Sequence, residues 1–192
     1  MHTSYARIRT FLLLALTICC LGAFSAAQNQ DQGQNQDQPK RGPSTPEERK
    51  RFLAIAHKME TSPLDFSLRK ERDWATHWLV DIPDINVNPC AELLANFMET
   101  RYPYKAEING QLAFSMAAFM IEHPDKVGDL VATNTAALEG GLKAYRSILR
   151  IEPTAQSRIL EALADQETQG KLTQYVRELT KRGCDNGDER GL

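Results

Sequence analysis

The sequence predicts an all-α fold, a single-domain bundle of about six or seven helices punctuated by prolines. Apolar residues after residue 45 recur at the three- and four-residue spacing of helices that bury one face. Prolines and capping residues stand between these apolar segments, where helices start and stop. No stretch alternates apolar and polar residues for long enough to predict a strand, and Asp, Asn and Pro weaken the short 82–87 segment.

The first two helices are predicted from the residues that open them. Thr45, Pro46 and Glu48 supply an N-cap, a first-turn proline and a capping-box glutamate. The apolar stripe that follows is Phe52, Ile55, Ala56 and Met59. Ser62 and Pro63 predict a second start of the same kind, which Pro83 ends. The stripe of this second helix is Leu64, Leu68, Ala75, Trp78 and Leu79.

Five further helices are predicted behind later chain breakers. These breakers are Pro89, Pro103, Pro124, Pro153 and Gly170. The helix after Pro124 is the longest, about 25 residues, with a stripe of Val127, Leu130, Val131, Leu138, Leu142, Tyr145, Ile148 and Leu149. Gly140 and Gly141 lie inside it and predict either a close approach of a neighbouring helix or a kink or ligand notch. The continuity of this helix therefore stays open.

Residues 1–27 have the pattern of a cleaved secretory signal. Arg7 and Arg9 precede an apolar run of 14 residues (11–24), and Ser25-Ala26-Ala27 follows it. The run is shorter than the roughly 20 residues that span a bilayer, so we expect no stable membrane span after processing. These residues predict an exported protein, periplasmic or extracellular.

The regions that flank the helical part have a different composition. Residues 28–44 contain two copies of Gln-Asn-Gln-Asp-Gln around Gly33 and predict a disordered Gln/Asn-rich linker. We expect the helical domain to cover residues 45–182 and a flexible C-terminal tail to cover residues 183–192.

Charge and cysteine content restrict the classes of function. Loss of the leader would leave 21 Lys+Arg against 25 Asp+Glu, and such a weakly acidic chain is not expected to bind nucleic acid. The four cysteines include Cys19 and Cys20 in the leader, where bulky Ile18 disfavours a lipidated Cys19. The remaining pair, Cys90 and Cys184, predicts one disulfide in an oxidising compartment, with two thiols as the alternative.

Two groups of residues are candidates for acid/base or metal chemistry. Asp73, His77 and Asp81 are four residues apart and share one face of the second predicted helix. That face lies opposite the apolar stripe, so a solvated surface is the simpler interpretation. Glu122 and His123 form a second candidate pair before Pro124, where His123 could equally cap a helix.

Trp74 and Trp78 are the only tryptophans and are one helical turn apart. Core packing is the simpler interpretation, and an aromatic platform for a ligand is the alternative.

The chain contains no Gly-x-Ser-x-Gly elbow, His-Glu-x-x-His zinc signature, phosphate loop, calcium loop or Cys-x-x-Cys motif. We therefore expect no cofactor or metal and favour a soluble, non-catalytic binding or structural module outside the cytoplasm, with an unknown protein or small ligand as partner. The alternative is a small secreted hydrolase or metal-dependent enzyme that uses the acidic and His residues of the second helix. A homo-oligomer built through a surplus apolar helix face is a third possibility.

Overall fold

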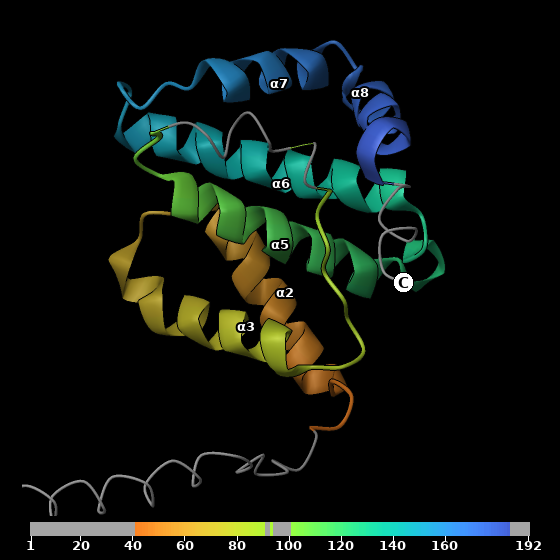
Figure 1. Cartoon of the computed structure of the whole chain (residues 1–192). Coiled ribbons are helices and arrows are strands. Elements are labelled where there is room, and N and C mark those ends of the chain that lie inside the picture. Colours follow the sequence, from red (N-terminus) through yellow and green to blue (C-terminus); the bar gives the residue numbers. More distant parts are fainter. Residues whose placement is uncertain (1–40, 91–92, 94–100, 185–192) are drawn as a thin grey trace, which may run out of the picture. The chain divides into compact units, whose positions relative to one another are not determined.

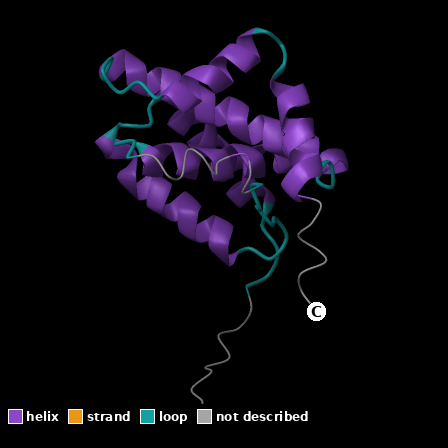
Figure 2. Ribbon diagram, turned by 45° about the horizontal axis from the view of Figure 1, so that its top comes forward, coloured by secondary structure: helices purple, strands orange, loops and turns teal. Residues whose placement is uncertain are grey.

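The computed structural model describes residues 41–90, 93 and 101–184, which belong to one compact unit, Arg41–Leu192. The described residues form six α-helices and no strand, which confirms the all-α fold (Figures 1 and 2). The helices are α2 (Pro46–Thr61), α3 (Arg69–Asp81), α5 (Lys105–Glu122), α6 (Leu130–Ile151), α7 (Arg158–Thr168) and α8 (Leu172–Leu179). Short helical turns are η1 (Phe66–Leu68), η2 (Pro124–Lys126) and η3 (Thr180–Cys184).

Helix α2 begins as the sequence predicts. The Thr45 hydroxyl accepts from the backbone N–H of Glu48 at 3.2 Å, and the Glu48 carboxylate accepts from the backbone N–H of Thr45 at 2.9 Å. This capping box satisfies two backbone donors that a helix start leaves without partners. Arg41 forms an ion pair with Glu48, so the chain just before α2 is held against its first turn.

The predicted start of the second helix at Ser62 and Pro63 is wrong. The backbone N–H of Ser62 donates to the carbonyl of Lys58 at 2.9 Å, so Ser62 ends α2. Asp65 then caps η1 by accepting from the backbone N–H of Ser67 at 2.8 Å. Helix α3 starts only at Arg69 and ends before Ile82, as the following proline requires.

Residues 82–90 form a loop, so the weak strand signal of 82–87 has no counterpart in the structure. Ile82 and Ile85 are buried and fasten this loop to the core. The helix predicted after Pro89 falls largely on residues 91–92 and 94–100, outside the described part.

Helices α5 and α6 pack side by side, and α6 is continuous through Gly140 and Gly141 (Figure 1). A Cβ atom built on Gly140 would lie 1.8 Å from Ser115 Oγ, so this glycine permits a close helix–helix approach. The long helix begins at Leu130, where Asp129 accepts from the backbone N–H of Ala132 at 3.0 Å. Val127 and Leu130 therefore lie at or before its first turn and are 43% exposed, so their place in the predicted apolar stripe is wrong.

The C-terminal helices cover the other side of α6. Helix α7 begins not at Pro153 but at Arg158, because Ser157 provides the N-cap. Tyr145 of α6 holds this start, since its hydroxyl donates to Glu161 at 2.5 Å and accepts from the backbone N–H of Ser157 at 3.0 Å. Gly170, with a positive φ of 68°, connects α7 to α8 in a conformation that glycine adopts easily.

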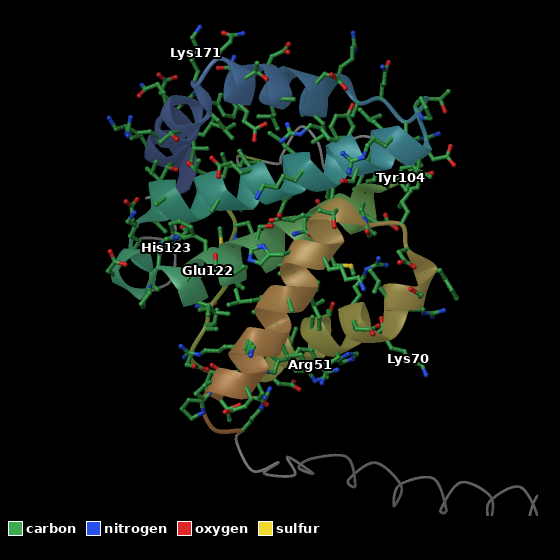
Figure 3. All side chains as sticks on the ribbon, turned by 180° about the vertical axis from the view of Figure 1, so that it is seen from behind. Arg51, Lys70, Tyr104, Glu122, His123 and Lys171 are labelled. Carbon is green, nitrogen blue, oxygen red and sulfur yellow. The ribbon has the colours of Figure 1, made fainter. Side chains whose placement is uncertain are left out.

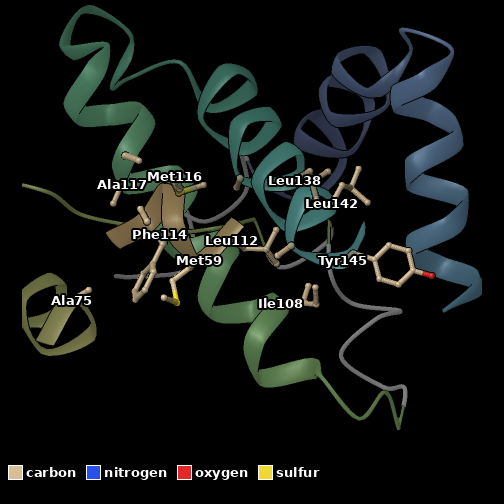
Figure 4. Packing of buried hydrophobic residues seen from close by; sticks show 14 of the residues in the cluster. Met59, Ala75, Ile108, Leu112, Phe114, Met116, Ala117, Leu138, Leu142 and Tyr145 are labelled. Atoms are coloured by element: carbon tan, nitrogen blue, oxygen red, sulfur yellow. The ribbon is translucent and has the colours of Figure 1, made fainter. Parts of the chain in front are cut away.

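One buried cluster connects the helices (Figure 4). Leu112 of α5 packs against Gly141 of α6, where a built Cβ would lie 2.9 Å from Leu112 Cδ2. Phe114 of α5 contacts Phe52 of α2. Over the described residues, no helix has the length and apolar character needed to cross a bilayer.

Candidate functional site

The C-terminal half of α3, the loop after it and the middle of α5 line a solvent-open cavity of about 520 Å³. Its walls are mostly aliphatic or aromatic: Leu79, Val80, Ile82, Ile85, Val87 and Phe114. Thr76 and Asn86 add two polar side chains. A volume within roughly 300–1,000 Å³, apolar walls and few polar groups are typical of ligand sites. The cavity therefore suits an apolar molecule or an alkyl chain.

Small residues on α5 keep one wall of this cavity open. Gly110 and Ala113 line it on the same helix as the larger Phe114. A Cβ atom built on Gly110 would meet no other atom within 4 Å. Phe114 is buried and makes an edge contact with Phe52, with ring centroids 5.5 Å apart. The cavity thus has a buried aromatic side chain at its floor and an unobstructed side at Gly110.

Two hydrogen-bonded clamps fix the loop that forms the opposite wall. Asp84 accepts from Ser44 through the backbone N–H at 2.9 Å and the hydroxyl at 2.7 Å. Asp84 also accepts from Arg49 Nη2 at 2.7 Å. At the other end, the backbone N–H of Cys90 donates to Oδ1 of the buried Asn134 at 2.9 Å. The loop is therefore tied to both α2 and α6.

The hydrogen bonds of the first clamp also lower the pKa of Asp84. Partial burial by itself raises the pKa of Asp84, but the hydrogen bonds from Ser44 and Arg49 outweigh burial and bring the pKa to about 2. Asp84 is therefore a charged anchor at neutral pH.

A second cavity of about 240 Å³ continues the first toward the N-terminal end of α3. Both cavities are lined by Thr76, Gly110 and Phe114, so they form one groove between α3 and α5. The second cavity adds the charged side chains Arg72 and Glu107. We name this whole surface the α3–α5 groove, with an apolar end at Leu79–Val87 and a charged end at Arg72 and Glu107.

The acidic and histidine residues expected on the second helix do not line this groove's apolar end. Asp73, His77 and Asp81 are all exposed on α3. His77 Nδ1 donates to the backbone carbonyl of Asp73 at 2.7 Å, a bond within its own helix. Among the described residues, no group of three or more His, Cys, Asp or Glu side chains could hold a metal ion.

Glu122 pairs with a residue other than the neighbour that the sequence suggests. Both Glu122 and His123 lie at the C-terminal end of α5 (Figure 3). Glu122 accepts from His57 Nε2 of α2 at 3.0 Å, whereas the ring of His123 packs on Phe119 with centroids 4.6 Å apart. No local pattern indicates this pair, because His57 and Glu122 are 65 residues apart in the sequence.

The two tryptophans belong to an aromatic stack between α2 and α3. Trp78 is 3% exposed and stacks on Phe52 with centroids 4.7 Å apart. Trp74 stacks on Trp78 at 5.8 Å, and the guanidinium of Arg51 lies 3.8 Å from the centroid of its ring. The structure thus places Trp78 in the core and covers Trp74 with a cation.

Cys90 is 7% exposed at the end of the loop wall. Cys184 ends η3, but its side chain is outside the described part, so the predicted pairing of the two cysteines stays a prediction.

No protein-family model matches this chain, and neither a curated protein nor a solved structure matches it.

The α3–α5 groove was not predicted from the sequence. The one local signal for it is Gly110, a glycine inside a segment of helical apolar spacing. That signal has no meaning until the fold shows which helix lies opposite.

Proposed function

We propose that this protein is an exported, non-catalytic binding module that holds an apolar ligand in the α3–α5 groove. The observation that carries the proposal is the cavity of about 520 Å³ with aliphatic walls and an open side at Gly110. An alkyl chain suits such a site because each methylene group removed from water contributes about 0.8 kcal/mol of transfer free energy.

Preorganisation of the groove supports a binding role. The clamps on Asp84 and on the backbone of Cys90 hold the loop wall before any ligand arrives. A site that is already ordered loses little conformational entropy when a ligand binds.

The open position of His77 supports a non-catalytic role over the hydrolase alternative. A hydrolytic or metal-assisted site needs an imidazole and carboxylates that converge on one point in a cavity. His77 is exposed and bonds to its own helix, and the groove's apolar end carries no titratable side chain.

Export and a Cys90–Cys184 disulfide belong to the same proposal. Export is supported by the leader pattern of residues 1–27. The pairing is supported by position, because Cys90 is bonded through its backbone to Asn134 near the start of α6. Helix α8, which leads into η3, lies beside that end of α6 (Figure 1).

The test is to occlude the groove at Gly110. Dodecyl maltoside below its micellar concentration is titrated into the full chain and the Gly110→Leu variant by calorimetry. The variant should lose binding, since its side chain fills the open side of the cavity, while its helix propensity rises by about 1 kcal/mol. Gly128→Leu is the matched control, because a Cβ there also meets nothing within 4 Å and Gly128 does not line the groove. Equal binding by the wild type and Gly110→Leu would refute the site, and no binding by the wild type would refute the proposed ligand class.

A further inference from the structure

We propose that the ligand is a single-chain amphiphile with a zwitterionic head group, and that its head lies between Arg72 and Glu107. The inference rests on the proposed function of the α3–α5 groove and specifies which end of the ligand lies where. The alkyl chain occupies the apolar end, and the head group occupies the charged end.

Continuity of the groove allows one molecule to reach both ends. Thr76, Gly110 and Phe114 line both the 520 Å³ and the 240 Å³ cavities. The direction in which a Gly110 side chain would point is empty for 4 Å, so no side chain divides the groove there. The two cavities differ in chemistry, since the first has no charged lining residue and the second has two of opposite sign.

Arg72 and Glu107, at the charged end of the groove, are not paired with each other. Arg72 and Glu107 are half-buried and line the same 240 Å³ cavity. In the described part of the chain, neither forms an ion pair within 4.0 Å, with the other or with a third residue. One nitrogen of Arg72 donates to the carbonyl of Pro63 at 2.6 Å, which orients the guanidinium and leaves its other N–H groups for a ligand.

Two partly desolvated charges of opposite sign select a head group that carries both signs. A partly buried ion that gains a hydrogen-bonded counter-charge recovers part of its lost hydration. An anionic head would pair with Arg72 but approach Glu107, and a cationic head would meet the reverse problem. A zwitterionic head can place its negative group at Arg72 and its positive group at Glu107.

The next cavity along α3 gives the head group access to water. It has a volume of about 320 Å³, and its charged lining residues are Asp65, Arg69, Arg72, Asp73 and Glu107. It shares Arg72 and Glu107 with the 240 Å³ cavity. A charged head group bound there can therefore keep part of its hydration shell.

The experiment compares four dodecyl amphiphiles below their micellar concentrations: dodecylphosphocholine, dodecanoate, dodecyltrimethylammonium and dodecyl maltoside. Calorimetric titration into the full chain should give the tightest binding for dodecylphosphocholine, about tenfold tighter than for dodecyl maltoside. Dodecanoate and dodecyltrimethylammonium should fall between these two.

Charge-removing variants then assign the preference to particular residues. Arg72→Gln should weaken dodecanoate and strengthen dodecyltrimethylammonium, each by about threefold to tenfold, and Glu107→Gln should do the reverse. Lys70→Gln and Glu71→Gln are matched controls, because they remove the same charges from α3 outside the groove; Lys70 projects away from the molecule (Figure 3). Arg72→Lys keeps the charge and should keep the order of affinities, which separates charge from damage to the fold.

The outcomes distinguish this inference from the proposed function. If all four amphiphiles bind alike and both groove variants leave their order unchanged, the zwitterion inference is wrong while the apolar site stands. If dodecanoate or dodecyltrimethylammonium binds more tightly than dodecylphosphocholine, the zwitterion inference is also wrong. If none of the four binds, the proposed function itself fails.

Discussion

Gly140 of α6 lies directly against Ser115 of α5, so close that a Cβ atom on Gly140 would fall 1.8 Å from Ser115 Oγ and 2.4 Å from Ser115 Cβ. This contact sets the distance between the two long helices of the core. The Glu60 carboxylate of α2 lies beside the same point, 3.2 Å from the built Cβ, and pairs with Lys143 of α6 at 3.2 Å. Three helices therefore meet where a side chain is missing.

Substitution by alanine should change the free energy of unfolding in opposite directions at Gly140 and Gly110, which both lie inside α-helices. Gly140→Ala should destabilise the protein by about 2 kcal/mol, because the overlap with Ser115 forces the helices apart. Gly110→Ala should stabilise it by about 0.5–1 kcal/mol, because alanine favours the helix and nothing lies within 4 Å of the new atom. Urea unfolding of both variants measures the two free energies.

A compensating change at Ser115 provides the control for this contact. Ser115→Gly removes the two atoms that a Gly140 side chain would overlap most, so Gly140→Ala should cost less in the Ser115→Gly background than in the wild type. Equal costs in the two backgrounds would show that the contact with Ser115 does not determine the need for glycine.

The Asp84 carboxylate should make the free energy of unfolding depend on pH in the acidic range. The folded-state pKa of Asp84 is about 2, below the ordinary value of about 3.9, so the folded state favours the charged carboxylate. Its contribution is complete above about pH 5 and declines as the pH falls through about 4 to 2. We expect about 1 kcal/mol after allowance for solvent screening, because the Arg49 and Asp84 side chains are 40% and 21% exposed.

The variant that tests this effect is Asp84→Asn. Its unfolding free energy should be about 1 kcal/mol below that of the wild type at pH 7, and the two should converge near pH 2. Asp81→Asn is the control, because Asp81 is exposed at the C-terminal end of α3, three residues before Asp84, and it should leave the pH profile unchanged. A wild-type advantage that persists undiminished at pH 2 would contradict the role assigned to the carboxylate.

Asn134 should couple the stability of α6 to the order of the groove wall. Asn134→Ala removes the acceptor of the Cys90 backbone N–H and should cost about 1–3 kcal/mol in unfolding free energy. It should also weaken dodecyl maltoside binding by about threefold, because the loop wall loses one of its two clamps. Asn88→Ala, an exposed asparagine in the same loop that lines neither cavity, should change neither quantity.

The proposed Cys90–Cys184 bond predicts the chemistry of the exported chain. Mass spectrometry without reductant should detect one cross-linked peptide pair and no leader. Reduction should lower the unfolding free energy by at most about 4–5 kcal/mol, the entropic value for a loop of about 95 residues. Recovery of both cysteines fully alkylated without reductant would contradict the pairing.

Local signals explain which parts of the fold could be predicted. Thr45 and Glu48 contact each other across three residues, so their capping box is legible in the sequence and is confirmed. Ser62 and Pro63 carry the same type of signal, but the end of α2 takes the Ser62 N–H, and no local pattern shows which helix claims a residue. Propensity therefore located the helices better than their boundaries.

The candidate site could not be predicted in the same way, because its partners are distant in the sequence. Thr76 and Gly110 meet in one cavity only after α3 and α5 are packed, and His57 reaches Glu122 across 65 residues. The candidates for acid/base or metal chemistry, Asp73, His77 and Asp81, share a helical face that is exposed, in line with the simpler interpretation of that face as a solvated surface. Spacing along one helix predicts a common face but not what covers that face.

The most direct test of the account is a methyl NMR titration of the full chain with dodecyl maltoside. We predict shifts for the methyl groups of Leu79, Ile82 and Val87, which line the apolar end of the groove, with Leu138 and Leu163 unchanged. Shifts confined to Ile159 and Leu163, in the cavity between α7 and α8, would contradict the assignment of the α3–α5 groove as the binding site.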